Sequence, residues 1–241
     1  EWESLNDLYN QKALNDTQYM AQGNALLDKY VTSPWIEDNT ELFQSVLSSK
    51  SKYNRYRSEY FKHLGRNAVV NRNMGKAIFY YEQRDKELEN EPGYIPTLSA
   101  AFLNITELNK MHKTTECIRA IEKVLPFIDS LPQLVDKSDV PLGTLINTYR
   151  ILSIAINCFD TQNFKEKADR AYHTLTNLHQ AVLRKNDLYP VNRVTMLEND
   201  IFFVDYSRAK AQNNLNLQEK ALKARIEHCK LAGDNGKDWA H

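Results

Sequence analysis

Apolar residues recur at intervals of three and four along almost the whole chain, and this spacing is the strongest constraint on its fold. In the segment 73–90 the apolar stripe consists of Met74, Ala77, Ile78, Tyr81 and Leu88. The same spacing returns in 16–30, 39–65, 97–110, 114–128, 144–160, 163–184, 193–213 and 217–231. Side chains three and four residues apart share one face of an α-helix, so the sequence predicts an all-α fold.

Composition narrows the class of protein further. Among 241 residues there are only 7 glycines and 7 prolines, too few for the many turns of an all-β fold. The 31 basic and 31 acidic residues cancel, whereas nucleic-acid binders and membrane-surface proteins usually carry a positive excess. The mean hydropathy of −0.60 and the short apolar runs argue against a membrane-spanning segment.

Proline and glycine divide the helical segments. Pro126 predicts a kink or an early stop in the helix that begins near residue 114. The stretch 129–143 holds two further prolines and a glycine and is predicted to be the longest connection. Asp16 is expected to cap the helix 16–30. The predicted organisation is N-terminal helices in 1–52, two helix pairs in 53–128, the connection 129–143, and two more pairs with a C-terminal tail in 144–241.

One segment carries a pattern that resembles a known repeat. It reads Phe61-x-x-Leu64-Gly65, Ala77 follows Gly65 by twelve residues, and Tyr81 comes four residues later. This resembles the tetratricopeptide repeat, in which a large residue and Leu-Gly lie on the first helix of a pair, and a small residue and an aromatic lie on the second. Glycine and alanine let two helices approach closely, and the aromatic ring fills the space beside them.

Weaker copies of the pattern follow along the chain. The second copy consists of Ala101, Ile105, Leu108, Cys117, Ile121 and Val124. The third contains Leu152, Ala155, Ile156, Phe159, Ala168, Tyr172 and Leu175, and the fourth only Ala209 and Ala221. The small second-helix residues lie 40, 51 and 53 residues apart, against a family period of about 34. The resemblance implies a superhelical array of antiparallel helix pairs with a concave binding surface, and a generic helical-hairpin solenoid is the alternative.

The resemblance also implies which residues line that concave face. Carried over from the first helix of each pair, they are Lys62, Arg66, Thr106, Asn109, Arg150, Asn157, Tyr206, Lys210 and Asn213. Long polar donors suit the backbone and carboxylate groups of a bound peptide. A protein or peptide segment is therefore the expected partner, and a homodimer is also open.

No pattern of catalytic or cofactor-binding residues is present. The chain lacks a Walker loop, a G-x-S-x-G elbow and an H-E-x-x-H helix, and none of its six histidines forms an i,i+4 pair. Its three cysteines lie 41 and 71 residues apart, which is neither a metal knuckle nor a disulfide framework. A basic, tyrosine-rich segment spans 50–72, but the acidic segment 82–91 can neutralise it. We expect no cofactor, no metal, no nucleic acid and no catalysis by this chain.

The residue composition of the helical pairs suggests a general function. Asparagine- and tyrosine-rich stretches such as NTYRILSIAINCFDTQNFKEKADRAYHTL resemble tetratricopeptide-like sensor regions of membrane histidine kinases of Bacteroidetes-type bacteria. That resemblance implies a periplasmic sensing module of a two-component system, with the membrane helix and kinase domains outside this chain. The alternatives are a soluble cytoplasmic adaptor and, less favoured, a nucleic-acid-binding regulator.

Overall fold

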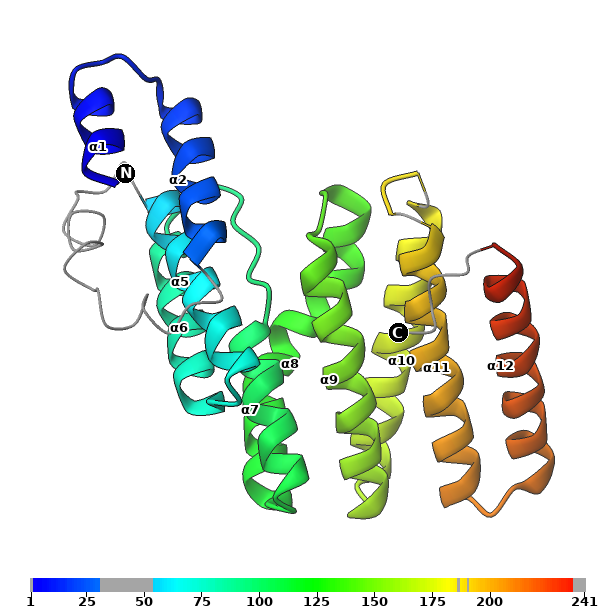
Figure 1. Ribbon diagram of the computed structural model, residues 1–241. Coiled ribbons are helices and arrows are strands. Elements are labelled where there is room, and N and C mark those ends of the chain that lie inside the picture. Colours follow the sequence, from blue (N-terminus) through cyan, green and yellow to red (C-terminus); the bar gives the residue numbers. More distant parts are fainter. Residues whose placement is uncertain (1, 31–53, 186, 190, 236–241) are drawn as a thin grey trace. The chain divides into compact units, whose positions relative to one another are not determined.

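The computed structural model describes residues 2–30, 54–185, 187–189 and 191–235. Within these residues it contains helices and no strand (Figure 1), which confirms the predicted all-α class. The helices in chain order are α1 (Trp2–Asn10), α2 (Asp16–Tyr30), α5 (Asn54–Val70), α6 (Met74–Leu88), α7 (Ser99–Lys110), α8 (Thr114–Lys137), α9 (Leu142–Thr161), α10 (Lys165–Arg184), α11 (Val191–Ala211) and α12 (Leu215–Asn235).

The helices form two compact units, each with its own core. The first unit, Glu1–Leu103, contains α1, α2, α5 and α6, and the second, Asn104–His241, contains α8 to α12. The boundary between the units falls within α7. In the second unit α9 contacts both α10 and α11, and α11 contacts α12, so these four helices lie side by side (Figure 1).

The N-terminal helices differ in detail from the prediction. Helix α2 begins at Asp16, but its cap is Asn15, whose Oδ1 accepts a hydrogen bond from the Gln18 backbone N–H at 2.9 Å. Gln18 Oε1 in turn accepts one from the Asn15 N–H at 3.0 Å, which completes a reciprocal capping box. The part of the predicted helix 39–65 before residue 54 lies outside the described residues. Helix α5 runs beyond that prediction to Val70 because Ala68 still faces the core.

Helix α8 contradicts the predicted stop at Pro126 and the predicted connection 129–143. It continues without a break through Pro126 and Pro132 to Lys137, so only residues 138–141 connect it to α9. A proline inside a helix costs about 3 kcal/mol because one hydrogen bond is lost and the ring crowds the preceding turn. The apolar face beyond Pro126 offsets this cost, since its buried residues are Ile128, Leu131 and Val135.

Ion pairs between α8 and α10 also support the second half of α8. Asp129 Oδ2 accepts from Arg170 Nη2 at 2.5 Å, and its Oδ1 accepts from the Thr174 hydroxyl at 2.7 Å. Two turns further on, Asp136 pairs with Arg184 at 2.9 Å. The arginines of both ion pairs are exposed, so each pair adds little, but together with the Thr174 hydrogen bond they hold the proline-containing part of α8 against its neighbour.

The four hairpins α5–α6, α7–α8, α9–α10 and α11–α12 share one turn. Its central residue has a φ between 52° and 58°, and these residues are Arg72, His112, Asn163 and Asn213. In each turn the next residue donates its N–H to the carbonyl five positions back, at 2.8–3.0 Å. This bond closes a Schellman motif. Helix α1 ends with the same hydrogen bonds around Lys12, although α2 begins later.

The shared turn gives the hairpins a common register. Five residues after the central residue stand Ala77, Cys117, Ala168 and Gln218, each donating its N–H to the residue four before it at 2.9–3.0 Å. The first three are the small residues that the sequence pattern predicts at this position. In the fourth hairpin the predicted residue, Ala221, stands three positions too late. Glutamine replaces the small residue there, which explains why the pattern is weak in that pair.

In the first unit the repeat positions of α5 and α6 lie against each other. A Cβ atom on Gly65 would come within 3.0 Å of the Tyr81 ring, so only glycine fits this approach without a shift. Ala77 is fully buried, Leu64 nearly so, and the Phe61 ring stacks on Tyr80 with centroids 6.5 Å apart. In the second unit Ala155 and Ala168 are likewise fully buried, on α9 and α10.

Candidate functional site

The predicted groove residues occupy equivalent positions in three hairpins. Arg66, Thr106 and Asn157 each stand six residues before the central residue of the turn. In the fourth hairpin that position belongs to Ser207, not to the predicted Tyr206. Asn213 is itself the central residue of its turn, so it belongs to the hairpin connection and not to the helical face. Tyr206 thus lies one residue before the equivalent position, and Asn213 lies beyond the end of α11 at Ala211.

Most of the predicted groove side chains are exposed, as binding residues must be. The exposed members are Arg66, Asn109, Arg150, Asn157, Lys210 and Asn213, and the partly buried ones are Lys62, Thr106 and Tyr206. Lys62 Nζ is held by Glu59 at 2.6 Å, within the same helix. The Thr106 hydroxyl is buried and has no hydrogen-bond partner. Lys62 and Arg66 belong to the first unit and the remaining seven to the second.

In the second unit the exposed stripes of α9 and α11 carry the groove residues. These helices contact each other, and Arg150 and Asn157 are exposed on α9 while Lys210 is exposed on α11. Phe203, three residues before the predicted Tyr206 on α11, is 48% exposed. Phe203 and Lys210 are seven residues apart and therefore share one face of α11. An exposed phenylalanine is a large apolar contact, and it was not among the predicted groove residues.

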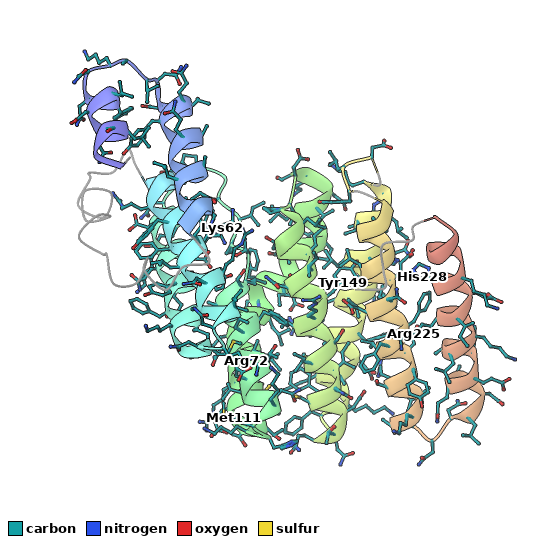
Figure 2. The ribbon with its side chains drawn as sticks, in the orientation of Figure 1. Lys62, Arg72, Met111, Tyr149, Arg225 and His228 are labelled. Carbon is teal, nitrogen blue, oxygen red and sulfur yellow. The ribbon has the colours of Figure 1, made fainter. Side chains whose placement is uncertain are left out.

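A chain of polar side chains crosses the second unit from α9 to α12, and the sequence analysis did not predict it. Its ends are Tyr149 and His228 (Figure 2). The Tyr149 hydroxyl lies 3.1 Å from His179 Nδ1, and His179 Nε2 lies 3.8 Å from Glu198 Oε1. Glu198 Oε2 lies 3.4 Å from His228 Nδ1. One side chain from each of four helices is therefore joined into a single network.

Burial sets the protonation state of this network. It lowers the pKa of His179, and the Glu198 carboxylate only partly opposes that effect. Burial raises the pKa of Tyr149 well above its usual value, with Glu198 and Asp200 adding to the shift. The lowered pKa favours an uncharged His179 at neutral pH. In the tautomer protonated at Nε2, its Nδ1 accepts a hydrogen bond from the Tyr149 hydroxyl and its Nε2–H faces Glu198. The sequence signal that could have suggested this network is the presence of His179 and His228 among leucines within the predicted helical segments.

A hollow of about 390 Å³ opens between α10, α11 and α12. Its lining residues are Tyr172, Phe202, Asp205, Arg208, Ala209, Gln212, Leu217, Lys220, Ala221 and Ala224. The Arg208 guanidinium lies 4.7 Å from the centre of the Tyr172 ring, and the Tyr172 hydroxyl donates to Asp205 at 2.7 Å. Burial and this bond raise the pKa of Tyr172 to about 12. The hollow therefore combines aromatic and aliphatic walls with a fixed cation.

Carboxylates from two helices hold Arg208 in place. Its Nε lies 3.5 Å from Asp160 Oδ2 on α9, and its Nη2 pairs with Asp169 on α10. Burial raises the pKa of Asp160, Arg208 opposes that shift, and Asp169 adds to it. The arginine thus joins α9, α10 and α11, and its charge is largely compensated.

The described part of the chain shows neither a metal-binding cluster nor a membrane-spanning helix. No group of three or more His, Cys, Asp or Glu residues there could hold a metal ion. Among the helices that the structure describes, none is long and apolar enough to cross a bilayer.

Comparison with known proteins assigns no family. No protein-family model, no curated protein and no solved structure matches the chain. It is an all-helical protein of ten helices within the described residues, and its role must be argued from its own geometry.

Proposed function

We propose that the chain is a non-catalytic, tetratricopeptide-like helical-repeat domain that binds a protein or peptide segment. The observation that carries this proposal is the turn that recurs around Arg72, His112, Asn163 and Asn213. Four hairpins closed by the same hydrogen bonds are what an internal repeat produces. Repeat domains bury their interior only against neighbouring repeats and use their outward faces for binding.

The binding surface in this proposal is the exposed face of α9 and α11. Arg150 and Lys210 supply cations, Asn157 supplies an amide, and Phe203 supplies an apolar contact. Such a face suits an extended peptide that carries acidic residues beside an apolar one. The hollow beside Arg208 is the natural place for a side chain of that peptide if it continues toward α12.

A binding experiment with a charge-matched control tests the surface. Fluorescent peptide pools of acidic, neutral and basic composition would be titrated with the full chain by fluorescence polarisation. Replacing Arg150 and Lys210 together with alanine should weaken binding of the acidic pool about tenfold, because two charge-assisted contacts are lost. The control replaces Arg119 and Lys123, two exposed cations of α8, and should leave the affinity unchanged. Equal losses in both variants, or no preference for acidic peptides, would contradict the proposed surface.

We further propose that this domain is the periplasmic sensing module of a two-component histidine kinase. A partner that binds one arrangement of the helices better than another would then shift a two-state equilibrium passed to the kinase. A soluble cytoplasmic adaptor remains the alternative. The sequence flanking residues 1–241 in the gene separates them, since a membrane segment and kinase domain are required by the first and not by the second.

The nucleic-acid alternative is weakened by charge pairing in the first unit. Arg57 pairs with Glu87 of α6 at 2.7 Å, and Lys62 pairs with Glu59 at 2.6 Å. These pairs occupy part of the basic segment, and the first is the neutralisation by the 82–91 segment that the sequence predicted. Oligonucleotide binding with a steep salt dependence would reopen that alternative.

A further inference from the structure

Two buried thiols from neighbouring hairpins face each other. Cys117 lies on α8 and Cys158 on α9, and their Sγ atoms are 3.9 Å apart. Cys117 is fully buried and Cys158 is 7% exposed. Cys117 Sγ donates to the Ile105 carbonyl at 3.6 Å, and Cys158 Sγ donates to Asn109 Oδ1 at 3.8 Å. The pair thus lies where the part of α7 after the unit boundary comes together with α8 and α9.

This distance is a contact and not a bond, but it is short enough to be closed. A disulfide has an S–S length of about 2.05 Å, so the two sulfur atoms must approach by roughly 2 Å in total. Rotation of the two short side chains can supply such a movement. The hydrogen bonds of the thiols that would be lost are weak ones, to the Ile105 carbonyl, to Asn109 Oδ1 and between the two sulfur atoms themselves.

We propose that Cys117 and Cys158 are a disulfide site, oxidised when the chain folds in an oxidising compartment. The oxidant is a small-molecule or protein disulfide. One thiolate attacks it to give a mixed disulfide, and the second thiolate displaces the oxidant's remaining sulfur. The two cysteines lose two protons and two electrons and gain one S–S bond, while the oxidant's S–S bond becomes two thiols.

The fold determines when this bond can form. Burial raises the pKa of Cys117 to about 12 and also raises that of Cys158. Only the thiolate is nucleophilic, so the closed, folded protein reacts slowly. Oxidation therefore belongs to folding, before α7, α8 and α9 close over the pair. The oxidation state of these two cysteines then depends on whether the chain folded in an oxidising or a reducing compartment.

This inference is independent of what the domain binds. A failure of the disulfide would leave the proposed peptide surface intact, because Arg150 and Lys210 are not part of the site. A failure of peptide binding would likewise leave the cysteine chemistry untouched. The disulfide would favour the periplasmic assignment over the cytoplasmic one, since disulfides persist in oxidising compartments.

Refolding under controlled redox conditions tests the proposal. The full chain carrying Cys229→Ser would be unfolded in guanidinium and refolded either with dithiothreitol or with a mixture of reduced and oxidised glutathione. Peptide mapping by mass spectrometry should then find a fragment that links residue 117 to residue 158, lighter by two hydrogen atoms than the separate peptides. The oxidised product should melt about 10 °C higher than the reduced one, because the bond closes a long loop.

Two controls keep the outcome decisive. Reduced, folded protein should resist Ellman's reagent until denaturant is added, in keeping with the burial of both thiols. The variant Cys158→Ala should take up glutathione at Cys117 or keep a free thiol, and should show no difference in melting between the two conditions. Free thiols or two separate glutathione adducts in the parent protein after refolding would overturn the proposal. A linked product that melts below the reduced protein would overturn it as well.

Discussion

Replacing Gly65 by alanine measures how closely α5 and α6 approach. The new methyl group would lie 3.0 Å from Cε1 and Cζ of Tyr81 and 3.2 Å from Cδ1. Such overpacking costs about 1–3 kcal/mol when the neighbour cannot move. Removing the flexible glycine from a helix gains about 0.5–1 kcal/mol. Because Tyr81 is partly buried and can give only a little, we expect a net loss of about 1 kcal/mol in the free energy of unfolding.

A second substitution turns this into a test of cause. In a Tyr81→Ala background the clash is absent, so Gly65→Ala should become stabilising by about 0.5–1 kcal/mol. Gly75→Ala on α6 is the matched control. Its nearest neighbour is Asn73 Oδ1 at 4.0 Å, so it should stabilise in both backgrounds. Urea unfolding followed by circular dichroism gives the global values, and hydrogen exchange in α5 and α6 isolates this hairpin from the other unit. A stabilising Gly65→Ala in the presence of Tyr81 would refute the close approach.

Three further predictions follow from the second unit and the turns. Burial lowers the pKa of His179 below its unfolded value of 6.5, so the neutral histidine stabilises the fold above that pH. The free energy of unfolding should therefore decline as the pH falls below about 6.5. A series of thermal melts at different pH values measures this decline, and His179→Gln should flatten it. Arg208→Ala should lower the free energy of unfolding in urea by about 2–4 kcal/mol, because it leaves the partly buried Asp160 without its cation. Arg170→Ala, at a 74% exposed position, should cost under about 1 kcal/mol, and equal losses in the two variants would contradict this reasoning. Replacing His112 by glycine should raise the melting temperature, because a φ of 56° costs a residue with a side chain roughly 1 kcal/mol. A lower melting temperature would show that contacts of the His112 side chain stabilise the protein by more than this backbone strain destabilises it.

The helices were predictable because their signal is local. Spacing of apolar residues decides which face is buried, and α6, α7, α9 and α10 begin and end within two residues of the predicted limits. Helix α8 was not predictable to the same degree. Proline is a local signal for a stop, but the burial of Leu131 and Val135 and the pairing of Asp129 with Arg170 are tertiary effects that outweigh it. A single sequence cannot weigh those contacts against one missing hydrogen bond.

The polar network could not be predicted from the sequence for a related reason. Its side chains, Tyr149, His179, Glu198 and His228, come from four helices and are separated by 19 to 30 residues along the chain. No motif of fixed spacing links them, and each taken alone resembles an ordinary core-edge residue. The thiol pair had the same property, because the spacing of 41 from Cys117 to Cys158 matches no known framework. Only the register of the hairpins brings either set together.

That register also bears on how the proposed surface would recognise a partner. In the proposed surface the hairpins α9–α10 and α11–α12 share their turn, and the position six residues before its central residue is Asn157 in the first and Ser207 in the second. A repeated contact along a uniform ligand would favour the same side chain in each hairpin. The variation instead points to recognition hairpin by hairpin, with each outward residue suited to a different group of the partner. On this view an arginine placed at Ser207 would create a new preference for an acidic residue at one position of the peptide, and the contacts of Arg150 would be unaffected.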